Sequence, residues 1–263
     1  MKNDTFSPNP GKNIEIDVDG KTYSRFPIKT ELFKRGDNYA EKIAEVVFKA
    51  LSVIPPSTKK SFYVIVSEKI VAVSQGRSYL IKDIQPSWWA TALSKFVKKT
   101  PHGIGLGSPW TMELAIREVG LPRIFLAAVA SVITKPFGLS GVFYHVAGSA
   151  ASAIDGPTSY SLYPSNVSAK LAPKDPKKAA EKIAKRVSQN VYSERNATRY
   201  LPRRQPGTLH EQRFSGAIII DANDLGRKVL GNATDKPNSF FEEVMRDNPM
   251  GQGSEQTPIV ILV

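Results

Sequence analysis

Apolar residues recur along this chain with the spacing of strands in some segments and of helices in others. Residues 14–18 alternate between apolar and polar side chains, which predicts a strand with one buried face and then a turn at Asp19-Gly20. Between residues 43 and 54 apolar side chains recur every three or four positions. This spacing predicts a helix that Asp37-Asn38 caps and that two prolines end.

The middle of the chain continues this mixture. Residues 62–66 predict a buried strand, and residues 70–73 prolong it as an extended segment. Ser87 caps a helix predicted to run through Lys99, and Ser108 caps the next helix, which has a proline at its first position.

Three more elements complete the pattern. Asp175 begins a helix with alanine, isoleucine and valine facing inward, another helix begins near Ser239, and residues 259–263 form a closing buried strand. Strands and helices follow one another without a regular order. The predicted fold class is therefore α+β, with mixed sheets and flanking helices in two lobes or one large domain. The polar residues 1–13 are expected to be a disordered tail.

The segment 216–231 combines a buried strand with acidic residues. Its three consecutive isoleucines predict a strand buried on both faces, and Asp221, Asn223 and Asp224 follow at once. Carboxylate and amide oxygens are preferred ligands of Mg²⁺ and Mn²⁺, so this strand end is a candidate metal site. A polar turn after a strand has the same composition and is the alternative.

Composition excludes several kinds of site. The 263 residues include no cysteine, which excludes disulfides, thiolate zinc sites and cysteine nucleophiles. No G-x-S-x-G nucleophile elbow is present, and His145, in an apolar context, is expected to be a core residue. The chain shows no secretory signal and no apolar run that could span a bilayer. We therefore expect a cytoplasmic protein without a membrane partner.

Positive charge is concentrated in one part of the chain. Between residues 170 and 213, twelve Lys and Arg and four Asp and Glu account for +8 of the net charge of +12. This region favours a polyanionic partner, either a phosphorylated small molecule or nucleic acid, with a solvated basic face as the alternative. The glycine-rich residues 102–108 are either a capped loop or an anion site, and their spacing is not that of a P-loop.

Two further segments contain candidate ligands. Asp155 lies in an Asp-Gly-Pro turn, and Gln252 follows Met250-Gly251 just before the closing strand. Glycine lets the backbone approach a ligand closely, and glutamine offers a carbonyl oxygen. A metal shared with the aspartates after residue 220 would clamp nucleotide phosphates.

Six short motifs lie at residues 32–38, 67–77, 153–155, 171–176, 221–227 and 250–252. They occur in the order found in the coenzyme F-420 gamma-glutamyl ligase family, and residues 25–263 resemble that family. The resemblance implies a gamma-glutamyl ligase-like domain over residues 25–263, preceded by a tail and strand in residues 1–24. Residues 86–97 and 102–124 resemble a bacterial subgroup whose substrate is not established.

The resemblance also implies roles for single residues. Asp155, Gln252 and the pair Asp221 and Asp224 would bind metal, and Lys69 and Asp155 would be catalytic. Two additional residues before Gly226, relative to the family pattern, leave open which of the two aspartates is the ligand. The nucleotide would contact Thr30, Glu31, Leu32, Phe33, Glu68, Lys69, Thr158, Met250, Gly251, Gln252, Gly253 and Ser254.

By this resemblance the expected function is a GTP-dependent amide ligase that requires Mg²⁺ or Mn²⁺. It would add L-glutamate to a carboxylate acceptor through an acyl phosphate. The expected partners are a nucleoside triphosphate, an acidic small-molecule acceptor, an amino acid and a second copy in a homodimer. Val73 replaces the family's second nucleotide lysine, and Thr158 replaces an asparagine. Together with the basic region, these changes favour the alternative, a non-catalytic nucleotide- or RNA-binding protein. A hydrolase using the same metal site is a third reading.

Overall fold

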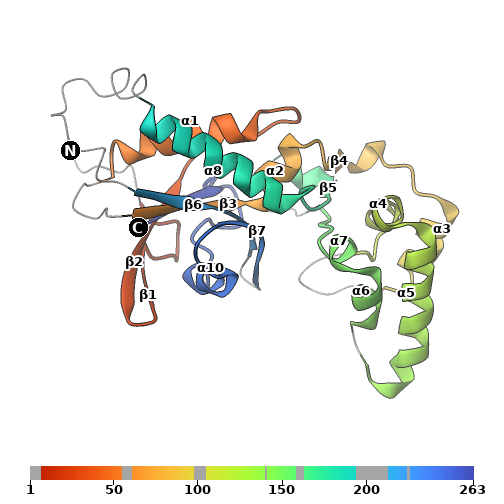
Figure 1. The fold of residues 1–263 in the computed structure, drawn as a ribbon. Coiled ribbons are helices and arrows are strands. Elements are labelled where there is room, and N and C mark those ends of the chain that lie inside the picture. Colours follow the sequence, from red (N-terminus) through yellow and green to blue (C-terminus); the bar gives the residue numbers. More distant parts are fainter. Residues whose placement is uncertain are drawn as a thin grey trace. The chain divides into compact units, whose positions relative to one another are not determined.

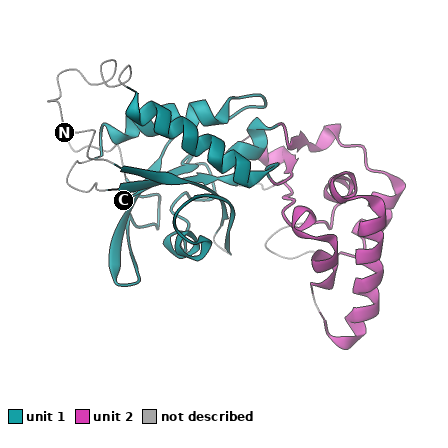
Figure 2. Ribbon diagram, in the orientation of Figure 1, with its two compact units in different colours: residues 1–75, 173–263 teal, residues 76–172 magenta. Residues whose placement is uncertain are grey.

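The computed structural model describes residues 7–54, 61–97, 105–139, 141–157, 163–193, 213–223 and 226–263. The chain divides into two compact units, which Figure 2 shows in different colours. Unit 1 comprises residues 1–75 and 173–263, and unit 2 comprises residues 76–172. Unit 2 is therefore an insertion between the two halves of unit 1.

Unit 1 is built on a six-stranded mixed sheet with the strand order β1-β2-β8-β3-β6-β7. Strands β3 and β6 are parallel, and all other neighbours are antiparallel. The strands predicted near residues 14, 62, 218 and 259 are confirmed, and the boundary expected after residue 24 falls within β2. The strands are β1 (Glu15–Val18), β2 (Lys21–Ile28), β3 (Ser61–Ser67), β6 (Arg213–Ala222), β7 (Arg227–Thr234) and β8 (Ile259–Leu262).

Helices cover both faces of this sheet. Helices α1 (Tyr39–Leu51) and α8 (Pro176–Tyr192) lie against one face, and α10 (Asn238–Val244) lies against the other (Figure 1). In β6, Ile219 faces α1 and α8, whereas Ile218 and Ile220 face α10. The isoleucine run is therefore buried on both faces, as its lack of alternation predicts. The mixed α+β class with flanking helices is confirmed.

Three predictions for unit 1 are wrong. Asn38 precedes α1, but its side chain makes no capping hydrogen bond. Residues 70–73 are not extended but belong to helix α2 (Glu68–Ser74), because tertiary packing of Ile70 and Val71 into the core overrides their strand propensity. Residues 7–13 are not a free tail. Asn9 donates a hydrogen bond to the Pro249 carbonyl (2.8 Å), and the Asn13 carbonyl accepts one from Arg25 (2.7 Å).

Unit 2 is mainly helical and has its own apolar core, which includes Leu106, Met112 and Ile124. Ser87 and Ser108 cap their helices as predicted, although the first helix ends at Ser94 rather than at residue 99. The elements are β4 (Ser78–Leu80), η3 (Ile81–Asp83), α3 (Trp88–Ser94), α4 (Pro109–Val119), α5 (Leu121–Thr134), η4 (Lys135–Phe137), α6 (Val142–Ala147), α7 (Ser149–Ser152), η5 (Ser165–Val167) and β5 (Ser168–Lys170).

His145 of helix α6 is not a core residue. In α6 the buried side chains are Phe143 and Ala147, one turn apart, so His145 points away from them and is exposed, contrary to expectation. Within the described ranges, no helix has both the length and the apolar character needed to cross a membrane.

Candidate functional site

Three segments that are distant in sequence meet at the carboxyl end of β3 in unit 1. The backbone amide of Thr30 donates to the Gln256 carbonyl at 2.9 Å, and the amide of Ser67 donates to the Pro258 carbonyl at 2.8 Å. Thr30 follows β2, Ser67 ends β3, and Pro258 precedes β8, which lies between those two strands. The sheet order thus brings together three segments that the sequence proposed as nucleotide contacts.

Helix α2 places Glu68 and Lys69 directly after this strand end. The Glu68 side chain is buried, whereas the Lys69 side chain is half-buried. An ammonium group on a partly buried stem can contact a ligand while its methylene groups pack against protein.

Exposed cations lie around the other end of α2. The Gly36 amide donates to the Ser74 carbonyl at 2.9 Å, which fixes the loop carrying the exposed residues Lys34 and Arg35. The Gln75 side chain accepts from the Lys174 amide (2.7 Å) and donates to the Lys174 carbonyl (3.0 Å). Two distant segments that carry three exposed lysine and arginine residues are therefore held next to one helix end.

Asp221 lies at the same edge of the sheet as Glu68. In the parallel pairing of β3 with β6, Ser67 lies opposite Ile220, so the next residue of each chain segment follows at the carboxyl edge. Ligands of α/β proteins commonly bind beyond this edge. The strand continues through Ala222, and Asp221 is half-buried and opposite Lys228 of β7.

The turn between β6 and β7 is polar, as the simpler interpretation of this segment predicted. The Asn223 amide donates to the Gly226 carbonyl (2.9 Å), and Asn223 Oδ1 accepts from the Gly226 amide (2.9 Å). Asp224 lies outside the described residues. A turn and a ligand site are compatible here, because the side chain of Asp221 precedes the turn.

The loop between α10 and β8 is closed by its own hydrogen bonds. Asn248, Gly251 and Gln256 all have left-handed backbone, with φ of 47°, 73° and 57°. Thr257 Oγ1 donates to the Met250 carbonyl at 2.7 Å and ties the two ends of the loop together. A Cβ on Gly251 would lie 2.7 Å from the Glu255 side chain, so glycine is needed there on two grounds.

Gln252, in the middle of this loop, has an unsatisfied polar atom. Its Nε2 is buried, and no described residue offers it a hydrogen-bond partner. Leaving such an atom unpaired costs roughly 1–3 kcal/mol. A ligand or water that pairs with it removes this cost. Rotation of the amide by 180° exchanges nitrogen and oxygen, so the same position can also offer a carbonyl oxygen to a cation.

The oxygen donors of unit 1 suit Mg²⁺ or Mn²⁺ in type. However, no group of three His, Asp or Glu side chains that could hold a metal ion forms among the residues that the structure describes. Of the predicted metal ligands in unit 1, Asp221 and Gln252 are described and Asp224 is not. The described residues therefore offer the oxygen ligands that a divalent ion prefers, but they do not by themselves supply a complete set of ligands.

Asp155 belongs to unit 2 and is held next to β5 by its backbone. Its amide donates to the Lys170 carbonyl (2.9 Å), and its carbonyl accepts from the Lys170 amide (2.8 Å). Asp155 itself is exposed. Thr158 lies outside the described residues, and the metal-binding and catalytic roles of Asp155 stay predictions.

The segment after Thr30 divides between surface and core. Glu31 and Leu32 are exposed, whereas Phe33 is buried, and the Lys42 ammonium lies 4.7 Å from the centroid of its ring. Of these three side chains, Glu31 and Leu32 are the ones free to meet a ligand in solution.

Sequence reasoning missed Asn9. Its Nδ2 donates to Thr257 Oγ1 (2.7 Å) as well as to the Pro249 carbonyl, so it braces both ends of the 249–257 loop. No local pattern could have shown this, because Asn9 lies in a polar segment about 240 residues from the loop that it contacts. A positioning role for the N-terminal segment follows.

Comparison with known families adds one finding. A family model described as F420-0:Gamma-glutamyl ligase matches residues 27–195, which is more than half of the chain. The matched range contains Thr30, Glu68, Lys69 and Asp155 and stops before Asp221. A search of curated proteins found no match.

Proposed function

The chain belongs to the F420-0:gamma-glutamyl ligase family and is an enzyme of the ligase class, and from this premise we propose a reaction and a site. It joins L-glutamate to a carboxylate acceptor, using GTP and Mg²⁺ or Mn²⁺. The observation that carries the proposal is the meeting of Thr30, Ser67 and residues 256–258 at the carboxyl edge of the sheet. This is where the triphosphate binds.

The proposed reaction has two steps. A carboxylate oxygen of the acceptor attacks the γ-phosphorus of GTP, GDP leaves, and an acyl phosphate forms. The amine of glutamate then attacks the acyl carbon, inorganic phosphate leaves, and the nitrogen loses a proton as the amide forms. Lys69 donates hydrogen bonds to the phosphate oxygens and offsets the charge that collects on them in the transition state.

The divalent ion is part of the proposal. Asp221 and Gln252 are the described residues of unit 1 that would hold it, and Asp224 follows Asp221 closely in sequence. The bound ion supplies positive charge to the phosphates. This part of the proposal is supported by the oxygen ligands that these residues offer and by the buried amide nitrogen of Gln252. The contribution of Asp155 rests on the family resemblance alone.

An acidic acceptor fits the cations around α2. Lys34, Arg35 and Lys174 are exposed and gather at its carboxyl-terminal end, where they favour a carboxylate or phosphate ligand. Much of the basic region identified in the sequence, residues 194–212, lies outside the described residues. The cations near α2 are therefore the part of the acceptor site that can be tested residue by residue.

A thermal-denaturation panel tests the nucleotide and metal together. GTP and ATP are added with and without Mn²⁺, and unfolding is followed by circular dichroism. A ligand present at a hundred times its Kd stabilises the folded state by about 2.7 kcal/mol, which corresponds to roughly 5–10 °C for a chain of this size. We expect GTP with Mn²⁺ to raise Tm and either component alone to do so much less.

Matched variants locate the site. Asp221→Asn and Lys69→Ala are expected to remove most of the nucleotide-dependent shift without lowering the Tm of the free protein. Asp17→Asn and Lys49→Ala change the same chemical groups at exposed positions of β1 and α1 and should keep the shift. Equal loss of the shift in all four variants would contradict the assignment.

The nucleic-acid alternative makes a different prediction. A protein that binds RNA through its lysines and arginines loses affinity steeply as salt increases, and it needs no divalent ion. If no triphosphate shifts Tm with Mn²⁺, while RNA binds with a steep salt dependence, the proposed site and reaction are wrong.

A further inference from the structure

Helix α5 of unit 2 presents an apolar face to solvent. The exposed side chains are Phe125, Leu126, Val129, Val132 and Ile133, and their spacing is that of one side of a helix. Leu126 and Ile133 are 62% and 61% exposed. The opposite side of α5 packs into the core of unit 2, so the helix is apolar on two opposite sides. A helix of this kind needs a partner for its second face.

Aromatic residues enlarge this face. Trp88 and Trp89 of α3 are 70% and 43% exposed, and the Trp89 ring lies 6.4 Å from the Phe125 ring, between centroids. Beyond the end of α5, Phe137 and Leu139 are also exposed. Figure 1 shows α5 as a long helix of unit 2. Tryptophan, phenylalanine and leucine therefore dominate a surface that water covers in the isolated chain.

The charges beside this face are positive. Between residues 121 and 154 the chain contains Arg123 and Lys135, both exposed, and no Asp or Glu. Lys95, just after α3, is exposed as well. In the neighbouring helix α4, Glu113 and Glu118 each form an ion pair with an arginine. The apolar face is thus accompanied by cations whose charge α5 itself does not balance.

We propose that this face docks on the surface of an anionic lipid bilayer, with α5 lying in the plane of the headgroups. Its apolar side chains enter the boundary with the acyl chains, the tryptophans sit at the headgroup level, and Arg123 and Lys135 bind lipid phosphates. The 14 residues of α5 are about 21 Å long, enough to lie on a bilayer but too short to cross it.

Charge also favours a bilayer over a second copy of the chain as the partner of this face. Two α5 faces packed together would bring Arg123 and Lys135 of both copies to one interface, and residues 121–154 contain no carboxylate to pair with them. A lipid surface supplies the missing negative charge. The proposal differs from the sequence-based expectation of no membrane partner, which considered only spanning segments. It does not depend on the proposed ligase reaction.

The tryptophans of this protein are an intrinsic fluorescence probe for the test. All three tryptophans lie in unit 2, and Trp88 and Trp89 belong to the proposed face. Vesicles of phosphatidylcholine with about 30% phosphatidylglycerol are expected to shift the tryptophan emission to the blue and to co-sediment the protein. Pure phosphatidylcholine vesicles should bind it less, and added salt should weaken binding to the anionic vesicles.

Leu126→Glu places a carboxylate within the apolar face. Because Leu126 is exposed, the substitution should not prevent folding. We expect it to weaken partitioning onto anionic vesicles roughly tenfold or more, whereas Val53→Glu, at a 43% exposed position of unit 1, should bind like the wild type. Circular dichroism checks that both variants fold. Absence of vesicle binding overturns the proposal. So does sedimentation that reveals a dimer which Leu126→Glu dissociates, since the face is then an interface between copies.

Discussion

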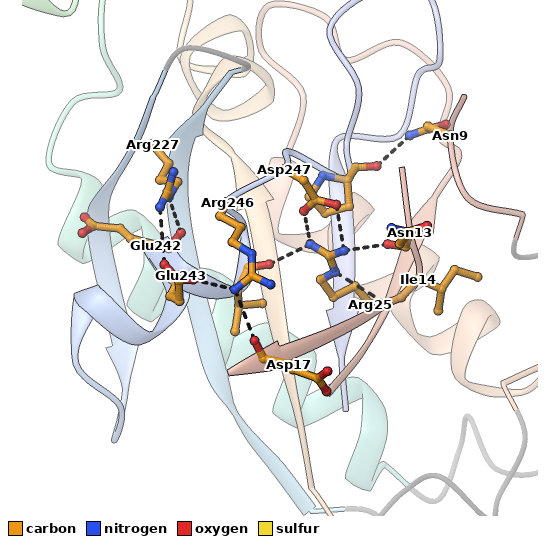
Figure 3. Close-up of polar contacts among 12 residues, drawn as sticks. Asn9, Asn13, Ile14, Asp17, Arg25, Arg227, Glu242, Glu243, Arg246 and Asp247 are labelled. Atoms are coloured by element: carbon orange, nitrogen blue, oxygen red, sulfur yellow. Dashed lines mark hydrogen bonds and ion pairs between the residues drawn. The ribbon is translucent and has the colours of Figure 1, made fainter. Parts of the chain in front are cut away.

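Removal of the Arg25 guanidinium should destabilise unit 1 more than removal of any exposed arginine. Arg25 lies in β2 and is 1% exposed. Its Nη1 donates to the Val244 carbonyl at 2.8 Å, and its Nη2 donates to the Asn13 carbonyl at 2.7 Å (Figure 3). Both nitrogens also bond to the carboxylate of Asp247. One side chain therefore joins the N-terminal segment, the sheet and the end of α10.

The expected magnitude follows from these contacts. Arg25→Ala leaves two backbone carbonyls and one partly buried carboxylate without their donor, and each orphaned acceptor costs roughly 1–3 kcal/mol when water cannot reach it. Asp247 keeps some access to water, since its side chain is 34% exposed, which places the total near the 3–5 kcal/mol typical of breaking a buried pair. We expect the free energy of unfolding to fall by about 4 kcal/mol.

Arg246→Ala is the matched control. Arg246 is 44% exposed and donates to Glu243 (2.6 Å) and to the Asp17 carbonyl (3.2 Å), contacts that Figure 3 shows beside those of Arg25. Exposed pairs of this kind contribute about 0–1 kcal/mol.

Two probes of urea denaturation report different parts of the protein. Circular dichroism reports the helices and strands of both units, whereas tryptophan fluorescence reports unit 2, which contains all three tryptophans. Arg25→Ala should move part of the circular dichroism change to lower urea, the part that comes from unit 1, and leave the fluorescence midpoint nearly unchanged. If Arg25→Ala costs no more than Arg246→Ala, the reasoning about the buried guanidinium is wrong.

Three further predictions concern packing, capping and pH. A Cβ on Gly231 would lie 2.1 Å from a backbone carbonyl oxygen of α8, so Gly231→Ala should cost at least about 1–3 kcal/mol in urea denaturation, whereas Gly226→Ala, with open space around it, should cost little. Ser108→Ala removes the cap of α4 and should lower the stability of unit 2 by about 1 kcal/mol, measured by tryptophan fluorescence. Burial raises the pKa of Asp247, but the hydrogen bonds and charge of its arginine partner outweigh burial and lower it below 3.8. This stabilisation is therefore present above about pH 4 and is lost as pH falls through the lowered value, so Asp247→Asn should flatten the acid limb of a stability–pH curve.

Several features of this protein could be predicted from the sequence because they depend on local spacing. Three consecutive isoleucines in β6 indicate burial on both faces, and the three- and four-residue spacing in α1 and α8 indicates one buried face. The serine caps of α3 and α4 were also predictable, since a cap needs only one side chain and the next turn of backbone. The family was recognised from short motifs, each of which lies within a few residues of sequence.

The meeting of Thr30 with Gln256, the burial of Arg25 and the bracing of a loop by Asn9 were decided only by the tertiary structure. Each depends on which strands become neighbours, and sheet order is a property of the whole chain. Residues 70–73 became helical because core packing outweighed the strand propensity of their β-branched side chains. On α5, the apolar run in the sequence could not show which side would be buried. In the structure Ile124 and Ala127 are buried in the core of unit 2, whereas Leu126 and Ile133 are exposed to water. The reason is that one layer of core can cover only one side of a helix.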